Sequence, residues 1–181
     1  TRIKDINEIQ VLSPFRRKTV NGVDQLNKVL QEGLNKKDFK KPEINYRYTT
    51  FRKYDKVMQC KNNYEKEIFN GDLGIIKRID TNEGVMVVEI DGEEINFFKD
   101  ELDELQLAYA TTIHKSQGSE YDTIIIPLTK QHKVMLQRNL IYTAITRAKK
   151  KVILIGDEAA LRYAIRNDRV NSRFSKLKSR I

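Results

Sequence analysis

Hydrophobic positions at the start of the chain predict a strand followed by a helix. Residues 9–13 form a short, mostly apolar run that ends at Pro14, as expected for a buried strand. The apolar residues that follow recur at helical spacing and predict a helix with one buried face: Val20, Val23, Leu26, Leu30 and Leu34. From residue 35 to 53 neither period is sustained, and we interpret this segment as a linker.

The middle of the chain shows a different pattern of short strands separated by turn residues. The turns are predicted at Asn70-Gly71-Asp72 and Asp91-Gly92. The runs between and around them have strand length: residues 56–60, 74–79, 85–90 and 94–98. Four or five short strands within about fifty residues predict a small β-barrel.

The α/β rhythm returns after residue 106. Mostly apolar strands are predicted at 107–112, 123–128 and 151–155, with helices at about 136–148 and 158–167, the last capped by Asp157. Strands that are apolar on both faces are typical of a parallel sheet covered by helices. The predicted fold class is therefore α/β, with a small barrel interrupting one α/β layer. We divide the chain at 1–50, 51–106 and 107–181.

Charge is unevenly distributed over these three parts. The 181 residues are 39% hydrophobic, which argues against general disorder, and carry a net charge of +9. Basic and acidic residues number 13 and 6 in residues 1–54, 6 and 14 in 55–106, and 15 and 5 in 107–181. The basic outer parts suggest a polyanionic partner, whereas the acidic barrel argues against non-specific phosphate binding over the whole surface.

Several classes of protein are disfavoured. The single cysteine, Cys60, has no partner for an internal disulfide, and the two histidines are too far from it in sequence for zinc spacing. No apolar run approaches the roughly 20 residues of a membrane span, and the chain opens at Thr1 without a leader pattern. We expect a cytoplasmic protein without a membrane partner, and a piece of a longer chain.

Two segments imitate metal-binding motifs of nucleotide hydrolases. Residues 153–158 resemble a Walker B strand, and residues 103–106 resemble an acidic helicase motif. Neither follows a Gly-x-x-x-x-Gly-Lys-Ser/Thr sequence, which would supply the phosphate loop. We therefore assign no metal site to this chain.

The first segment with candidate chemistry is residues 110–122, between two predicted strands. Its hydroxyl, amide and imidazole side chains beside Gly118 offer donors suited to phosphate oxygens. Glu120 could accept from a ribose hydroxyl or orient a cation. The end of a strand is where open α/β sheets place ligands, although an ordinary structural turn explains the same residues.

The second segment is residues 138–148. At 100° per residue one polar stripe contains Asn139, Thr143, Thr146 and Arg147, and the opposite side is apolar. Arg147 then has two interpretations. It could complement the helix C-terminal dipole, worth roughly 0.3–1 kcal/mol, or act as an arginine finger on a transferring phosphate.

Taken together, the two segments resemble motifs V and VI of superfamily 1 helicases, the latter through Tyr-x-Ala-x-Thr-Arg-Ala at residues 142–148. The resemblance is to the RecD/TraA branch of DNA helicases and covers nearly the whole chain. Further matching segments are Gln10-Val11-Leu12-Ser13-Pro14, Gly22-Val23, Leu26-Asn27, Asn62-Asn63-Tyr64 and Phe69-Asn70-Gly71-Asp72-Leu73-Gly74.

The resemblance implies a C-terminal RecA-like motor domain interrupted by an SH3-like barrel. Such a domain faces an N-terminal motor domain of the same parent chain across an ATP cleft, and that other domain holds the P-loop and most of the Mg²⁺ coordination. The isolated chain is then inactive as an ATPase. Expected partners are single-stranded DNA, tracked from 5′ to 3′, and subunits of a nuclease complex.

The resemblance also assigns roles to residues. Arg147 corresponds to the catalytic arginine finger and, with Gln117, Gly118 and Glu120, faces the nucleotide. Gln117 stands where more distant helicases have lysine, which puts a charged contact from that position in doubt. The residues implied to face single-stranded DNA are Thr112, His114, Lys115 and Ser116.

Two other groups are weaker candidates for DNA contact. Ser13, Arg16 and Arg17 follow the first strand, where a basic loop is often merely solvated. Asn63 and Tyr64 suit amide bonding and base stacking, but a tyrosine packed into the barrel explains them equally. Two alternatives to a motor stay open: a non-catalytic module whose barrel docks a protein, and a passive nucleic-acid-binding domain.

Overall fold

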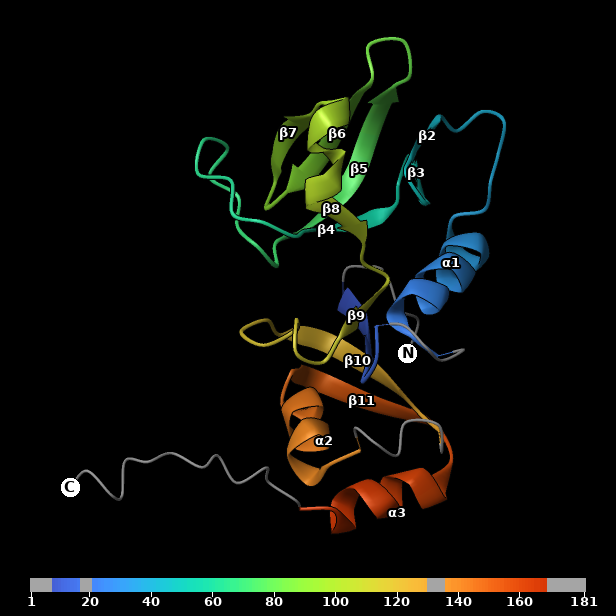
Figure 1. Ribbon diagram of the computed structural model, residues 1–181, viewed down its shortest axis with the longest axis vertical. Helices are drawn as coiled ribbons and strands as arrows, with labels where there is room; N and C mark the ends of the chain where they lie inside the picture. The colour runs from blue at the N-terminus through green and yellow to red at the C-terminus, as the bar shows by residue number, and fades with distance from the viewer. Residues whose placement is uncertain (1–7, 17–20, 130–135, 169–181) are drawn as a thin grey trace, which may run out of the picture.

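The computed structural model describes residues 8–16, 21–129 and 136–168, which form two stacked lobes (Figure 1). One lobe is built around a parallel sheet and the other around an antiparallel barrel. In chain order the elements are β1 Ile9–Ser13, α1 Val23–Leu34, β2 Glu43–Tyr46, β3 Thr49–Arg52, β4 Lys56–Gln59, β5 Leu73–Asp80, β6 Val85–Ile90, β7 Glu93–Phe97, the 3₁₀ helix η2 Lys99–Glu104, β8 Leu105–Leu107, β9 Ala110–Thr112, β10 Tyr121–Leu128, α2 Arg138–Ile145, β11 Ala148–Gly156 and α3 Glu158–Arg166.

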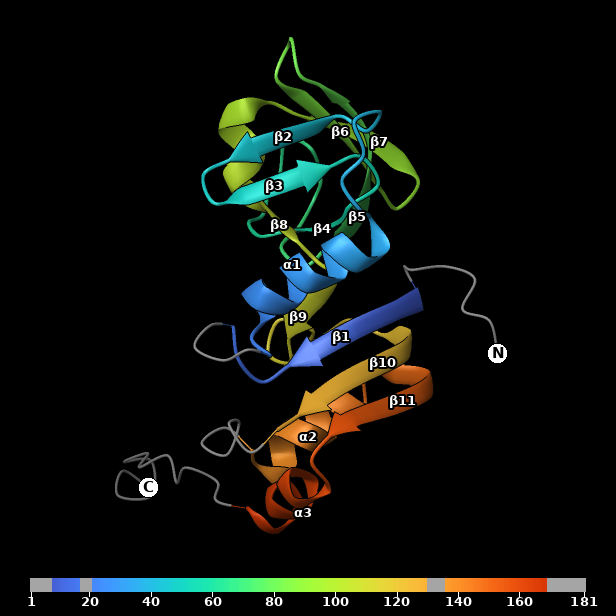
Figure 2. The same ribbon diagram turned by 90° about the vertical axis from the view of Figure 1, so that its right-hand side faces the viewer.

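The parallel sheet has the strand order β11-β10-β1-β9. All of its strand pairs are parallel, so the carboxyl ends share one edge and the amino ends share the other. Helices α2 and α3 pack against β10 and β11, and α1 packs against β9 (Figure 2). The core of this lobe comes from apolar residues of the sheet and of the two helices, including Leu12, Ile124, Ile126, Ile141 and Ala164.

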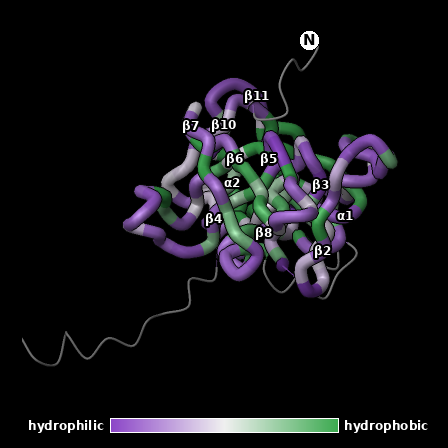
Figure 3. Tube along the Cα trace, turned by 90° about the horizontal axis from the view of Figure 1, so that it is seen from above, coloured by the Kyte–Doolittle hydropathy of each residue, from purple (hydrophilic) through white to green (hydrophobic). Residues whose placement is uncertain are grey.

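The barrel lobe is antiparallel, with the order β7-β6-β5-β4-β8 and the hairpin β2-β3 beside it. Its buried core includes Phe51, Val57, Ile76, Val88 and Phe97. Seen from above, the loops at the rim are hydrophilic, whereas hydrophobic positions gather on the strands (Figure 3). The predicted α/β class with a barrel interrupting the parallel sheet is therefore confirmed.

Two predicted elements differ from the structure. The linker expected at 35–53 contains the β2-β3 hairpin, whose Ile44 and Phe51 pack on the barrel core. The strand predicted at 107–112 is two strands, because the chain changes sheets at Ala108-Tyr109: β8 pairs with β4 in the barrel, and β9 pairs with β1 in the parallel sheet. The domain boundaries remain a prediction. The predicted boundary between residues 50 and 51 falls inside β3 and therefore divides the hairpin.

The buried face of α1 is apolar only in part, since Val23 is buried and Leu30 packs on the barrel core as predicted, whereas polar residues that were not predicted complete it. Leu34 is 60% exposed, whereas Asn27, Gln31 and the following Asn35 are buried one turn apart. Val20 lies outside the described residues. The Asn27 amide donates to the carbonyl oxygens of Leu107 and Ala110 and accepts from the Ala110 N–H. It thereby satisfies the backbone where the chain passes from barrel to sheet, as buried polar groups require.

The other two amides converge on Asp55, which is fully buried. Its carboxylate accepts from Gln31 Nε2 at 2.6 Å and from Asn35 Nδ2 at 2.7 Å. It also accepts from the Arg52 N–H at 2.7 Å and the Tyr109 hydroxyl at 2.9 Å. Burial raises the pKa of Asp55, although these bonds oppose the rise. One carboxylate therefore connects α1, the hairpin and the crossover between the lobes.

Candidate nucleotide and DNA interface

The loop 113–120 connects β9 to β10 and is anchored at its first half. Ile113 and Ser116 are fully buried, and the Ser116 hydroxyl donates to Ile113 O at 2.8 Å. Gly118 has φ +90°, a left-handed conformation, and open space where a Cβ would stand. Glycine is thus needed here for backbone conformation and not for close approach.

This loop runs between the two edges of the parallel sheet. At the carboxyl edge Thr112 pairs with Ser13, and at the amino edge Tyr121 pairs with Ala148. The two edges are roughly 20 Å apart, from about six strand residues at ~3.3 Å each. Only the first residues of the loop 113–120 therefore lie at the carboxyl edge, where open sheets place ligands. Its last residues lie at the opposite edge.

Arg147 and the last residues of the loop 113–120 meet at the amino edge. Helix α2 ends at Ile145, so Arg147 stands in the turn before β11, half-buried, and not on an exposed stripe of the helix as predicted. Its Nη1 lies 3.5 Å from Ser119 O, and its carbonyl accepts from the Tyr121 N–H at 2.8 Å. Its Nε is buried without a hydrogen-bond partner among the described residues. The structure thus brings together segments 28 residues apart.

The other residues predicted to face the nucleotide are neighbours of Ser119 in sequence. Gln117 and Gly118 are exposed, as is Glu120, whose carboxylate lies 3.5 Å from Lys149 Nζ. The exposed amide and the unpaired guanidinium donors suit phosphate oxygens. No group of three or more His, Cys, Asp or Glu side chains within the described ranges is placed to hold a metal ion.

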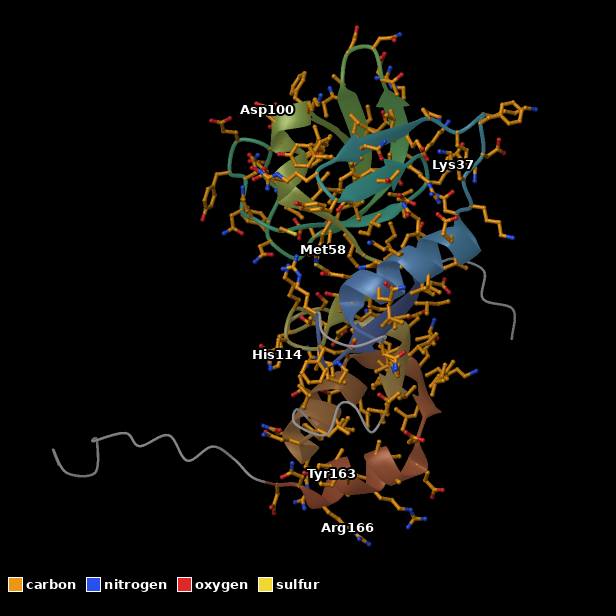
Figure 4. All side chains as sticks on the ribbon, turned by 45° about the vertical axis from the view of Figure 1, so that its right-hand side comes forward. Lys37, Met58, Asp100, His114, Tyr163 and Arg166 are labelled. Carbon is orange, nitrogen blue, oxygen red and sulfur yellow. The ribbon has the colours of Figure 1, made fainter. Side chains whose placement is uncertain are left out.

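The residues predicted to face DNA differ in accessibility. His114 is exposed beside the carboxyl edge, below the barrel (Figure 4). Thr112 is half-buried and its hydroxyl accepts from the Lys115 N–H at 3.2 Å. Lys115 Nζ lies 3.3 Å from Gln106 Oε1 and 3.8 Å from Cys60 Sγ, so it reaches toward the barrel. Ser116 is fully buried and offers no surface to a strand in this conformation.

The weaker DNA candidates after β1 are placed as follows. Ser13 is buried, and its hydroxyl donates to Asn21 O at 2.7 Å, which closes the loop after β1. Arg16 is exposed, with Nε 3.6 Å from Asp24. Arg17 lies outside the described residues. Of these positions, Arg16 offers the only described exposed cation.

Asn63 and Tyr64 occupy the long loop between β4 and β5. Asn63 is half-buried, with Nδ2 3.4 Å from Glu104 Oε2 and Oδ1 accepting from the Lys66 N–H. Tyr64 is 76% exposed and makes an edge-to-face contact with Phe69, whose ring centroid is 6.2 Å away. Tyr64 is therefore not packed in the barrel core, and its ring is free to stack.

Asp55 and the amides of α1 were not among the predicted site residues. A signal was present, because Asn27 and Gln31 lie four residues apart in the predicted helix and Asn35, at the start of the predicted linker, continues the same spacing. No helix in the described part of the chain is long and apolar enough to cross a membrane.

Comparison with protein families gives two matches. Residues 26–90 match the SH3 domain of ATP-dependent RecD-like DNA helicases, and residues 107–155 match the UvrD-like helicase C-terminal domain. The first match covers the hairpin and most of the barrel. The second covers β9, β10, α2 and the loop 113–120, together with most of β11.

Curated relatives agree with these matches. The chain is 38% identical over 162 residues to the ATP-dependent RecD2 DNA helicase of Deinococcus radiodurans, covering 89% of this chain and 22% of that protein. It is 35% identical over 116 residues to the RecBCD enzyme subunit RecD of Mycolicibacterium smegmatis, covering 64% and 20%. The chain thus spans about a fifth of these relatives' length.

Solved helicases share the fold. A structure described as showing DNA unwinding at forked DNA by two coordinating Pif1 helicases has a TM-score of 0.58 at 21% identity, covering 88% of this chain and 44% of that one. Bacteroides Pif1 bound to single-stranded DNA gives 0.57 at 18% identity, covering 90% and 46%.

Proposed function

This chain belongs to the RecD-like DNA helicases, and from that membership we propose that it is the C-terminal half of an ATP-driven DNA motor. In this proposal ATP binds between this half and an N-terminal P-loop domain of the same parent protein. That domain supplies most of the Mg²⁺ coordination. The isolated chain hydrolyses no ATP, because it contains no phosphate loop.

The observation that carries the proposal is the contact between Arg147 and the loop 113–120. Nη1 of Arg147 lies 3.5 Å from Ser119 O, beside the exposed Gln117 and Glu120. A guanidinium keeps its charge and can fork onto two phosphate oxygens. We assign Arg147 as the arginine finger.

The DNA end of the proposal lies at the other edge of the sheet. His114 and Thr112 at the carboxyl edge, with Tyr64 on the barrel loop, are the side chains we assign to single-stranded DNA. Tyr64 would stack on a base and His114 would reach the backbone. Closing of the ATP cleft would then shift this grip relative to that of the other motor domain. Travel from 5′ to 3′ is the direction that the family resemblance implies.

ATP turnover by the parent protein tests the assignment. Arg147→Ala should lower kcat by roughly 10³-fold or more, the range attributed to arginine fingers, with the melting temperature unchanged. Arg147→Lys should rescue little, because ammonium does not fork. Arg166→Ala is the matched control, since Arg166 is an exposed arginine in the last turn of α3. Normal turnover by Arg147→Ala, or an equal loss with Arg166→Ala, would reject the finger.

The setting of the parent protein is part of the proposal. Relatives include both a RecD2 helicase and RecD subunits of the RecBCD enzyme. We propose a cytoplasmic protein that works on DNA either alone or with nuclease subunits. Co-purification of the parent protein from its native host, followed by size-exclusion chromatography, separates the two cases.

A further inference from the structure

The segment from the end of α1 to the start of β4 carries a surface unlike the rest of the barrel. Residues 36–54 contain seven basic and two acidic residues, whereas residues 55–106 carry a net charge of −8. Exposed aromatic rings alternate with the cations along this segment. We call the following residues, at the end of the hairpin next to α1, the hairpin surface: Lys36, Phe39, Lys40, Lys53 and Tyr54.

The aromatic rings of the hairpin surface are presented to solvent. Phe39 is 93% exposed and Tyr54 51%. Cations lie over both of them: Lys40 Nζ is 5.6 Å from the Phe39 centroid and Lys53 Nζ is 4.9 Å from that of Tyr54. Exposed rings beside cations are the combination that sites for single-stranded nucleic acid use.

The backbone at Tyr54 adopts an unfavourable conformation. Tyr54 has φ +75°, in the left-handed region that disfavours a bulky residue. Its N–H donates to Ile76 O at 2.7 Å, which fixes the turn against β5. A turn alone would favour glycine or asparagine at this position. The tyrosine is thus kept where its ring is half-exposed.

The cations of the hairpin surface are available to a polyanion. The two nearby glutamates are already neutralised, since Glu43 pairs with Lys37 at 2.8 Å and with Arg52 at 3.3 Å, and Glu32 pairs with Arg52 at 2.6 Å. Within the described part of the chain, the salt bridges do not include Lys36, Lys40 or Lys53. Asp38, which accepts from the Lys40 N–H, is the remaining acidic residue of the segment, so these lysines outnumber the carboxylates left without an ion pair on this side of the barrel.

The location separates this surface from the residues assigned to DNA above. The loop between α1 and β2 extends on one side of the barrel, and the loop of residues 60–72 extends on the other (Figure 1). Lys37, beside Phe39 in sequence, lies on the opposite side of the molecule from His114 (Figure 4). A strand on the hairpin surface would be a different segment from one held by His114.

We propose that the hairpin surface is a second binding site, for single-stranded nucleic acid. Cations track the phosphates while exposed rings stack on bases, and a duplex would hide the base faces that the rings need. The site does not depend on the motor assignment, because it uses neither Arg147 nor the loop 113–120. The acidic remainder of the barrel confines the bound strand to this side by repulsion.

The test is fluorescence anisotropy of the 181-residue chain with a fluorescein-labelled dT oligonucleotide of about 20 nucleotides, titrated at several salt concentrations. Lys40→Gln/Lys53→Gln should weaken binding by roughly 10-fold at 0.1 M salt and lower the salt slope by about 1.4, at about 0.7 per phosphate contact. Lys77→Gln/Lys99→Gln is the matched control. It removes the same charge elsewhere on the barrel and should change the affinity for dT less than about 2-fold.

Stacking is tested separately. Phe39→Ala should weaken dT binding by about 5-fold or more, Phe39→Leu should not restore it, and an abasic oligonucleotide should not distinguish Phe39→Ala from the parent sequence. Phe39 is almost fully exposed, so melting temperatures should not change. The proposal is overturned if the Lys40/Lys53 variant binds like the parent sequence, if both lysine pairs lose equally, or if a blunt duplex binds as tightly as dT. Retained turnover by Arg147→Ala would reject the arginine-finger assignment alone.

Discussion

Removal of the Asp55 carboxylate should destabilise the whole chain, because four donors depend on it. Asp55→Ala removes the acceptor of the Arg52 N–H, of the Tyr109 hydroxyl and of one N–H each of the Gln31 and Asn35 amides, whose other N–H groups still donate to Thr50 O and Lys53 O. Asp55 is fully buried, with 0% of its surface accessible to solvent. Water therefore cannot replace the lost acceptor without opening the junction between the lobes.

The expected magnitude follows from the donor count. A buried donor left unsatisfied costs about 1–3 kcal/mol, so four donors at the lower limit give a loss of about 4 kcal/mol. Relaxation of the two amide side chains would lower this figure, and the cavity left by the carboxylate would raise it. Because folded domains are stable by only ~5–15 kcal/mol, a loss of this size leaves little stability.

Urea unfolding followed by circular dichroism measures the effect. Tyr109→Phe removes a single donor and should cost about 1 kcal/mol, and a double-mutant cycle with Asp55→Ala should show coupling of similar size. Asp80→Ala is the matched control, since Asp80 accepts only from the backbone of Asn82 and Glu83 in an exposed turn. A cost below about 1 kcal/mol for Asp55→Ala, or no coupling to Tyr109, would refute the idea that this carboxylate holds the lobes together.

Two further predictions concern stability. Burial alone would raise the pKa of Glu101, but hydrogen bonds from Lys66 Nζ and the Phe98 N–H outweigh it and lower the pKa below its usual 4.5. Glu101→Gln should therefore cost about 1 kcal/mol at pH 7, and the difference should vanish as the pH falls below about 4.5, as urea midpoints at several pH values would show. Gly156→Ala should unfold the β11 end or cost at least ~3 kcal/mol, because a Cβ there would stand 1.9 Å from Leu128 O. Gly33→Ala, with open space in α1, should instead stabilise by about 0.5–1 kcal/mol in thermal melts.

The elements predicted well from the pattern are those whose local signals agree with their surroundings. Strand β6 begins and ends at Val85 and Ile90 as predicted, since an apolar run lies between two turns. The β2-β3 hairpin was missed because each strand has four residues and carries polar side chains on its outer face. Such short strands form only where a neighbouring core, here that of the barrel, receives Ile44 and Phe51.

The pattern predicted the candidate site as two segments, and the family resemblance alone implied that both face the nucleotide. Motif spacing singled out Arg147 and Gly118. It could not give the strand order of the sheet, which decides where the two segments lie relative to each other. Residue burial was also hidden, because Ser116 looks like its polar neighbours in sequence yet lies under the loop with its hydroxyl bonded to Ile113 O. Periodicity placed Arg147 on a helix, whereas the helix ends two residues earlier and the chain turns into β11.

The path of the loop 113–120 shows how two distant edges of one sheet can respond together. Its first half is held by the buried Ile113 and Ser116, and its last residues are bonded to Arg147. Between these two attachments stands Gly118 in a left-handed conformation with open space around its Cα. A force on Arg147 from a closing nucleotide cleft would therefore reach Ser119 directly. Rotation at Gly118 would absorb part of this force before it reaches Thr112, since the anchored half of the loop is packed in the core and resists small displacements.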